Sequence, residues 1–375
     1  MAAIDLFPRP SLSFERNDRL HRAVQDGVAA LGGLGRPAPF SIAIVDLADG
    51  SSSAKLGWGA HKPDEVHYIA SSAKIAALLA AHGLLDMANR FVAAGQVTKA
   101  VVSGLASGVG ALAWMGVTPA ALGVPDEKRP LFKQLREIMD PAIDAAAPIE
   151  LEKAQRRFRL PTYEAVLAPP SGKSRFVPGF TAGFRSALRE MIVPSSNAHA
   201  GICVRGVGYG YLNGMMAAAG LRPGGSGVWL AGDYVGQWPP VRVPSANDGE
   251  VAQAGTALTM AKMMAMIVND GILDKAACGA MRGLLADAVH GIDVPYVTRS
   301  DVAAALRIPI DRLTHTKLGY GPLKKGGAVA SETFRLQGLR NASKAYVVAY
   351  QNAGDAVLID DVCYVLRHAI TAYEG

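Results

Sequence analysis

The chain has 375 residues, half of them apolar and 19% charged, with a formal net charge of +6. This length and composition exclude a single small module and a disordered chain, and they predict two domains or one domain with a large insertion. The charge is spread along the sequence without aromatic interleaving or a nucleic-acid motif, so its densest basic run, Lys153 to Arg159, predicts a solvated helix face and no nucleic-acid partner.

The first residues, MAAIDLFPRPSLSFERNDR, lack the basic start and apolar core of a secretory signal. We therefore expect a cytoplasmic protein, or a periplasmic or secreted one if the N-terminus is truncated. An apolar stretch from Val101 to Val117 approaches membrane-spanning length, but four glycines and two serines interrupt it. It predicts a buried or loosely packed helical segment, and no membrane span is expected.

Two short strands precede a long helix. Pro39 to Leu47 is a continuous apolar and β-branched run that predicts a buried strand, and a second strand is expected around Ala54 to Gly59. From Ser71 onward the apolar residues recur three and four positions apart for several turns. That spacing predicts a long, mostly buried helix.

Helical patterns dominate residues 86–255, with a Pro-, Gly- and Ser-rich surface loop expected from Leu167 to Phe180. After one more helical region, three extended segments predict an antiparallel meander, and Ala356 to Tyr373 predicts a closing helix; the extended segments are Leu313 to Tyr320, Ala328 to Leu336 and Lys344 to Gln351. The predicted fold is α/β (α+β). Residues 1–85 plus 256–375 form one domain, and 86–255 form an inserted all-helical domain, with a ligand cleft between them.

A serine and a lysine open the long helix as Ser71-Ser72-Ala73-Lys74. This spacing places both side chains on one helical face, near the positive end of the helix dipole. A serine hydroxyl needs a base, and a desolvated lysine with a lowered pKa serves as one. We expect Ser71 to be the nucleophile and Lys74 its proton acceptor; the alternative is an N-cap serine and a surface lysine.

The second motif, Ser195-Ser196-Asn197, lies between two helical stretches. Here Ser195 is expected to pass a proton to the leaving group, and the Asn197 amide is expected to hold Lys74 and the acyl chain. A plain helix cap is the alternative. His199, two residues later, is expected to be a structural histidine because the sequence has no GxSxG elbow.

The third motif is Lys317-Leu318-Gly319 in the first strand of the meander. The lysine supplies positive potential for a substrate carboxylate, and the glycine allows close approach of the substrate backbone. Lys325, in the rival Lys-Gly-Gly, remains the alternative, and Lys317 is preferred because PLKKGG has the composition of a hairpin turn.

In this order and context, the three motifs resemble the S-x-x-K, S-D-N and K-T-G set of class A β-lactamases and penicillin-binding proteins. The resemblance extends from about Pro39 to the C-terminus and is clearest in YIASSAKIAALLAA and PSSNAHAGICVRGVG. It implies the roles given above for Ser71, Lys74, Ser195, Asn197 and Lys317. Gly319 would lie beside the substrate, and the oxyanion hole would consist of the backbone N–H groups of Ser71 and Tyr320.

Two departures from that pattern limit what it implies. Ser196 replaces the aspartate of the second motif, and Leu318 replaces the hydroxyl residue of the third, which puts recognition of a penicillin-like acid in doubt. No ExxxN follows the second motif, and Asp233, Asp248 and Glu250 are the only nearby acids. The base for deacylation is thus unassigned, and fast β-lactam hydrolysis is not expected.

The sequence therefore predicts a β-lactamase-related serine hydrolase or acyltransferase that cleaves an amide or ester in a small-molecule or peptide-like acyl substrate. The alternatives are a true class A-type β-lactamase or D-Ala-D-Ala peptidase and, in another class, a catalytically silent ligand-binding protein of the same fold. Cys203, Cys278 and Cys363 are odd in number, without CxxC spacing, so neither a disulfide framework nor a metal site is expected. No phosphate loop is present, and no cofactor is expected.

Overall fold

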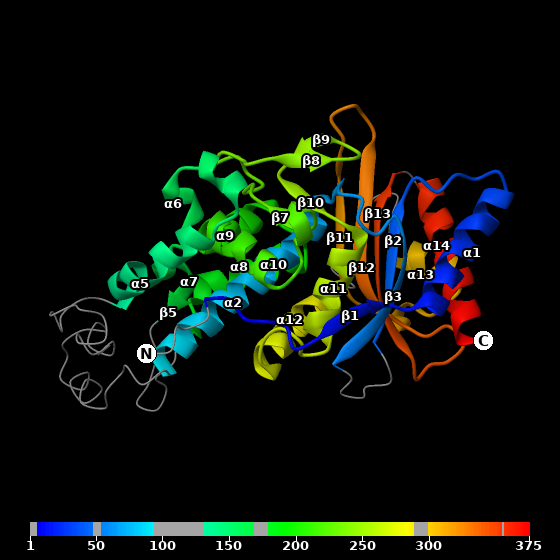
Figure 1. Cartoon of the computed structure of the whole chain (residues 1–375), viewed down its shortest axis with the longest axis horizontal. Helices are drawn as coiled ribbons and strands as arrows, with labels where there is room; N and C mark the ends of the chain where they lie inside the picture. Colours follow the sequence, from blue (N-terminus) through cyan, green and yellow to red (C-terminus); the bar gives the residue numbers. More distant parts are fainter. Residues whose placement is uncertain (1–5, 48–53, 94–130, 169–178, 289–298, 355) are drawn as a thin grey trace.

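A computed structural model describes residues 6–47, 54–93, 131–168, 179–288, 299–354 and 356–375 (Figure 1). Within these ranges the α-helices are α1 (Asp18–Gly33), α2 (Lys74–Ala93), α5 (Leu131–Ala146), α6 (Arg156–Arg159), α7 (Tyr163–Val166), α8 (Ala182–Ile192), α9 (Asn197–Val207), α10 (Tyr209–Ala218), α11 (Ala257–Val268), α12 (Lys275–Asp287), α13 (Arg299–Leu306) and α14 (Ala356–Glu374). Short 3-10 helices are η1 (Ala70–Ala73), η4 (Ile149–Lys153), η5 (Pro223–Gly225) and η7 (Ile310–Arg312).

The strands are β1 (Ser13–Arg16), β2 (Ser41–Asp46), β3 (Lys55–His61), β4 (His67–Tyr68), β5 (Leu167–Ala168), β6 (Gly179–Phe180), β7 (Trp229–Leu230), β8 (Val243–Ser245), β9 (Gly249–Val251), β10 (Gln253–Gly255), β11 (Leu313–Pro322), β12 (Ala328–Gln337) and β13 (Ala345–Ala353). Six of them form the main sheet, in the order β1-β3-β2-β13-β12-β11. β1 pairs with β3 in parallel, and the other pairings are antiparallel. The sheet therefore joins the two ends of the chain and leaves β11 at one edge.

Helices cover both faces of this sheet (Figure 1). On one face α1, α13 and α14 enclose a core that takes Ile42 and Ile44 from β2. On the other face α11 packs against β2 and β13, and Ala43 and Val45 join the larger core there. Because both faces are covered, β2 is apolar throughout, which explains the continuous apolar run in its sequence.

The larger core continues from α11 into the helices beside it. α2 leaves the sheet at η1 and contacts α8, α9 and α10, so its apolar residues are enclosed nearly all round. A second sheet of three short strands, in the order β4-β10-β7, lies at the start of α2. η1 contacts β10 of this sheet as well as β11 and β12 of the main sheet. The residues that open α2 thus lie where the two sheets meet.

The architecture expected from the sequence is confirmed: an antiparallel meander of β11, β12 and β13, joined by β2 and flanked by helices. The expectation that 86–255 is all helical is wrong in detail, because the short strands β5 to β10 lie within it. Strands of two or three residues are too short to show an alternating pattern. The domain boundaries stay a prediction. The loop expected from Leu167 to Phe180 begins and ends in the paired strands β5 and β6.

The basic run also differs from the single helix expected, since η4 ends at Lys153 and α6 is one separate turn. Arg156 and Arg159 both pair with Asp144, at 3.0 Å each. Within the described ranges, no helix is long and apolar enough to cross a membrane. The apolar stretch from Val101 to Val117 lies outside those ranges.

A close contact between α1 and β3 gives a test of the packing. A Cβ atom added at Gly59 would lie 2.6 Å from the backbone of Leu20 and of His21. We expect Gly59→Ala to lower the free energy of unfolding by about 1–3 kcal/mol, because main-chain atoms have little room to move. Urea denaturation measures this change.

Gly283 on α12 provides the matched control, since it is exposed and a Cβ added there meets nothing within 4 Å. Gly283→Ala should raise the free energy of unfolding by about 0.5–1 kcal/mol through its helix propensity. A Gly59→Ala variant as stable as the wild type would contradict the packing of α1 on β3.

Candidate active site

Ser71 lies in η1, the single 3-10 turn that precedes α2. The sequence predicts this serine on the first turn of an α-helix, whereas the structure begins the α-helix at Lys74. Ala70 has a φ of 45°, a conformation that residues with a side chain seldom adopt. Within η1, Ser71 is partly exposed and its neighbours are buried. The turn therefore fixes the backbone and leaves the Ser71 residue accessible.

Lys74 is fully buried, and its amine contacts three uncharged oxygens. Nζ lies 2.6 Å from the Ser195 carbonyl oxygen, 3.2 Å from Ser195 Oγ and 2.8 Å from Asn197 Oδ1. Two of the motifs expected to act together, more than 120 residues apart in sequence, thus meet at one nitrogen atom.

A left-handed backbone at Ser195 turns both of its oxygens toward Lys74. Its φ is 61°, which is strained for a serine. The helix-cap alternative holds for its neighbour, because Ser196 is the N-cap of α9 and accepts a hydrogen bond from the His199 N–H. Ser196 Oγ also lies 2.9 Å from His199 Nδ1. His199 is therefore held by the cap, as expected of a structural histidine.

Lys317 reaches the same serine from the edge strand β11. It is fully buried, and its Nζ donates to Ser195 Oγ at 2.7 Å and to the Leu318 carbonyl at 3.0 Å. Leu318 packs in the core on the other face of the sheet. Lys325 is exposed in the turn between β11 and β12, where Gly326 has a φ of 92°. Of the two lysines weighed from the sequence, Lys317 is the one that reaches Ser195.

Gly319 brings β11 into main-chain contact with the serine turn. A Cβ atom added there would lie 2.1 Å from the Ile69 carbonyl oxygen, 2.5 Å from the Ser72 nitrogen and 3.1 Å from the Ser71 nitrogen. Only glycine allows this approach without displacing one of the two segments. Tyr320 follows on β11 and is half-buried. The two backbone N–H groups expected to form an oxyanion hole, those of Ser71 and Tyr320, belong to these adjoining segments.

Burial lowers the pKa of Lys74 to about 7, and the nearby Cys203 thiol acts weakly in the opposite direction. A neutral amine has two N–H donors and one lone pair. The donors match the Ser195 carbonyl and Asn197 Oδ1, which can only accept. Because Lys317 donates to Ser195 Oγ, the Ser195 hydroxyl proton is free to point at the Lys74 lone pair. The arrangement can therefore carry a proton between Lys74 and Ser195.

Tyr234 contacts Lys74, and the sequence analysis did not identify it. The Lys74 Nζ lies 4.9 Å from the centre of the Tyr234 ring, and the Tyr234 hydroxyl donates to the Ala70 carbonyl at 3.4 Å. Its φ of 61° is again left-handed. Burial raises the pKa of the phenol, so the ring stays neutral. Nothing in residue spacing signals this contact, because it depends on an uncommon backbone conformation at a non-glycine residue.

Asp233, one of the acids weighed as a deacylation base, has its carboxylate fully engaged. It is 2% exposed and pairs with Arg205 at 2.6 Å. The carboxylate also accepts from the backbone N–H groups of Gly236, Gln237 and Trp238 at 2.8–3.1 Å. These donors hold the loop after β7 in place. Asp233 thus acts as an anchor for the loop.

The other two acids lie farther along, at the β8–β9 hairpin. Asp248 Oδ1 accepts from the backbone N–H of Lys324 at 2.6 Å. Glu250 is exposed, and its carbonyl accepts from the Lys324 side chain. Asp248 is therefore engaged in holding the β11–β12 turn, and Glu250 lies on the exposed strand β9.

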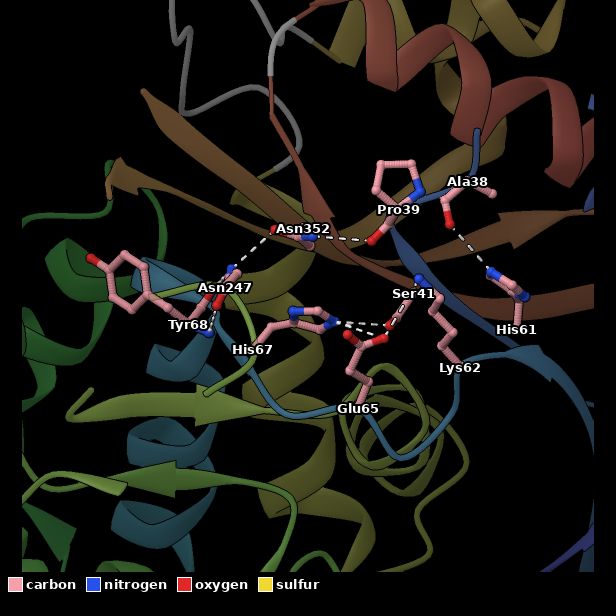
Figure 2. Close-up of polar contacts among 10 residues, drawn as sticks. All are labelled: Ala38, Pro39, Ser41, His61, Lys62, Glu65, His67, Tyr68, Asn247 and Asn352. Carbon is pink, nitrogen blue, oxygen red and sulfur yellow. Dashed lines mark hydrogen bonds and ion pairs between the residues drawn. The ribbon is translucent and has the colours of Figure 1, made fainter. Parts of the chain in front are cut away.

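The strand that leads into η1 is tied to the end of the main sheet by a chain of amides (Figure 2). The Tyr68 N–H donates to Asn247 Oδ1 at 2.7 Å, and Asn247 Nδ2 donates to Asn352 Oδ1 at 3.2 Å. Asn352 Nδ2 in turn donates to the Pro39 carbonyl at 3.0 Å. These bonds fix β4, and with it the approach of the chain to Ser71.

A second group in Figure 2 contains a serine, a histidine and an acid, but its geometry does not fit a catalytic triad. Ser41 Oγ lies 2.9 Å and Glu65 Oε2 lies 3.9 Å from the same nitrogen, Nε2 of His67. A triad needs the acid on the opposite ring nitrogen. Ser41 is also fully buried, so no substrate reaches it. Burial lowers the pKa of His67, and its role is to hold β4 to the sheet.

A cavity of about 330 Å³ includes Tyr234 in its lining. Aromatic and charged side chains share this lining, which includes Tyr68, Tyr234, Trp238, Arg242, Asp248, Glu250 and Lys324. Tyr234 thus contacts Lys74 and also lines this cavity, whereas neither Ser71 nor Lys74 is among the lining residues.

None of the three cysteines is assigned a role in the site. Cys203, Cys278 and Cys363 are buried in α9, α12 and α14, and each is a free thiol whose pKa is raised by burial. A raised pKa leaves a cysteine a poor nucleophile. In the part of the chain that the structure describes, no three His, Cys, Asp or Glu side chains gather as a metal site would require.

No protein-family model matches the chain, and no curated protein matches its sequence. Among solved structures, serine β-lactamases and PBP-A are similar to the chain in structure along almost all of its length. The TLA-3 extended-spectrum β-lactamase is 11% identical, with 93% of this chain and 98% of that one covered at a TM-score of 0.48. A β-lactamase from Chitinophaga pinensis DSM 2588 is 11% identical (95% and 98% covered, TM-score 0.48), and PBP-A is 13% identical (95% and 97%, 0.46). Identities this low show a similar fold alone, so the activity has to be argued from the residues of this chain.

The main-chain contact at Gly319 leads to a test of the site. Gly319→Ala should push η1 away from β11 and slow the reaction of Ser71 with a fluorophosphonate by about 100-fold, the usual cost of a displacement near 1 Å. Labelling rates followed by intact mass measure the effect. Gly179→Ala is the control, because a Cβ there meets nothing within 4 Å. Equal labelling rates in both variants would contradict the predicted role of this contact.

Proposed function

We propose that the chain is a β-lactamase-like serine hydrolase or acyltransferase that cleaves an amide or ester through an acyl-enzyme on Ser71. One observation carries the proposal: Lys74 and Lys317 contact the same Ser195 hydroxyl from two sides, at 3.2 Å and 2.7 Å, beside the serine turn. Both lysines are fully buried. Two buried lysines that contact one hydroxyl suit proton transfer.

In the proposed acylation, Ser71 Oγ attacks the carbonyl carbon of the substrate and gives its proton to the neutral Lys74 amine. The developing oxyanion is held by the backbone N–H groups of Ser71 and Tyr320. When the bond to the leaving group breaks, the proton returns from Lys74 through Ser195 to the leaving nitrogen or oxygen. Lys317 supports this step by donating to the Ser195 oxygen.

Asn197 has two roles in this scheme. Its Oδ1 accepts from Lys74 and keeps the amine in place. Its Nδ2 group remains a donor for the acyl chain of the substrate. Gly319, expected from the sequence to admit the substrate backbone, instead lets the serine turn lie against β11. The substrate is therefore expected to be a small-molecule or peptide-like acyl compound.

Hydrolysis of the acyl-enzyme is not part of the proposal, because no acid is assigned as its base. Asp233 and Asp248 are hydrogen-bonded to other parts of the chain, and Glu250 lies on the exposed strand β9. Rapid turnover of penicillins is accordingly not expected. The competing function is a ligand-binding protein with the same fold and no acyl-enzyme. Reaction with an acylating probe separates the two.

The first prediction of this mechanism is a single covalent adduct on Ser71. Incubation with a fluorescent penicillin or a fluorophosphonate should add one probe per chain, detected by intact mass. Ser71→Ala should remove the adduct, while Ser13→Ala, at an exposed serine of β1, should keep it. If neither probe reacts with the wild type, the enzyme proposal fails and the binding protein is favoured.

The second prediction concerns pH. Lys74 accepts a proton only as a neutral amine, so adduct formation should rise with pH and reach half its maximum near the Lys74 pKa of about 7. Well below that pH, the rate should fall about tenfold per pH unit. Stopped-flow fluorescence with the penicillin probe gives this profile.

Lys262→Gln is the matched control. Lys262 is a partly buried lysine whose pKa is also lowered by burial, and it contacts the rings of Phe14 and Trp58 instead of the site. Its profile should equal that of the wild type. A rate that is constant between about pH 5 and pH 9 would exclude Lys74 as the base.

A further inference from the structure

Tyr234 bridges the proposed base and the residue before the proposed nucleophile. Its ring lies over Lys74 Nζ at 4.9 Å, and its hydroxyl reaches the Ala70 carbonyl at 3.4 Å. Lys74 is therefore in contact with this ring as well as with the oxygens of Ser195 and Asn197. An aromatic ring beside an amine is a poor partner for water.

The loop after β7 holds Tyr234 in that place against an unfavourable backbone conformation. A φ of 61° is unfavourable for a residue with a side chain such as tyrosine. The Asp233 carboxylate offsets this strain, since it gathers the Arg205 side chain and three backbone N–H groups of the loop. Underneath, α9 has a glycine at Gly201, where a Cβ would lie 2.7 Å from the Asp233 carbonyl oxygen. The loop is therefore closely seated on α9.

Tyr234 also lines the cavity of about 330 Å³, whose lining contains neither Ser71 nor Lys74. A volume of that size takes several water molecules, each of which occupies about 30 Å³ in the liquid. Arg242, Glu250 and Lys324 give it a polar rim. Tyr234 is the side chain that both lines this cavity and contacts Lys74.

Hydrolysis of an acyl-enzyme needs water at the acyl carbon and a base for its proton. The water oxygen bonds to that carbon, the bond to Ser71 Oγ breaks, Oγ takes up a proton and a carboxylic acid leaves. We propose that Tyr234 is a positioning residue that keeps water in the cavity from the acyl-enzyme on Ser71. The acyl group then lives long enough to pass to an amine or hydroxyl acceptor, with Ser71 Oγ again taking the proton as the new amide or ester forms. This inference rests on the acyl-enzyme proposed above.

The test compares the lifetimes of the adduct in variants of the full chain. Each protein is labelled with a fluorescent penicillin, freed of excess probe, and followed by intact mass for the rate of formation and of loss. Tyr234→Ala should lose the adduct at least about tenfold faster than the wild type, because water gains access to the ester. Tyr234→Phe should retain the slow loss of the wild type, since it keeps the ring. Val235→Ala, at the exposed neighbouring residue, is the matched control.

If Tyr234→Ala does not fold, Tyr234→Leu provides the same comparison, since it removes the ring and keeps apolar bulk. Loss from either variant at the wild-type rate would overturn this inference and leave the acyl-enzyme proposal intact. Faster loss from Tyr234→Phe than from Val235→Ala would overturn the role of the ring and assign it to the hydroxyl. If the penicillin leaves no adduct on the wild type, the acetyl adduct from p-nitrophenyl acetate is followed in the same variants. The absence of any wild-type adduct with the penicillin, p-nitrophenyl acetate and the fluorophosphonate would overturn the acyl-enzyme proposal and the inference together.

Discussion

A buried amine held by neutral oxygens is the interaction on which the proposed site depends. Lys74 is wholly enclosed, and its amine contacts a carbonyl, a hydroxyl and an amide oxygen. A carboxylate in their place would stabilise the ammonium ion and raise the pKa of Lys74. Neutral acceptors instead leave burial as the largest influence, which lowers this pKa to about 7. The other side chains of the site are arranged around that requirement.

The fold supplies these side chains from distant parts of the chain. η1 and α2 bring Ser71 and Lys74, the turn before α9 brings Ser195, and the edge strand β11 brings Lys317. Because β11 is the last strand of the main sheet, one of its edges pairs with no other strand of that sheet, and β11 contacts η1. Three residues with left-handed backbones, at positions 70, 195 and 234, lie around Lys74. Such a concentration of strain is common where side chains must point inward to one atom.

Local patterns were enough to predict the strands of the meander, the long helix and the three motifs. Each depends on residues close together in sequence: an alternating or helical period, or a serine and a lysine three positions apart. The choice of Lys317 over Lys325 also followed from local turn chemistry, since PLKKGG forms the turn between β11 and β12.

Tertiary contacts could not be predicted in this way. Tyr234 meets Lys74 only because Asp233 folds the loop after β7, and none of these residues carries a recognisable motif. The short strands β4, β7 and β10 likewise owe their existence to one another, and two or three residues show no period. The 3-10 turn at Ser71 was expected as α-helix, because the two kinds of helix share their sequence preferences at a helix start.

The contact at Gly319 has a consequence for how this site can vary. η1 and β11 touch there through main-chain atoms, since an added Cβ would approach the Ile69 carbonyl oxygen to 2.1 Å and the Ser72 nitrogen to 2.5 Å. A contact made by main-chain atoms cannot be adjusted by exchanging one side chain for another of similar shape. Variation around Ser71 must then come from the side chains and loops beside this contact, while the spacing of η1 and β11 is inherited unchanged.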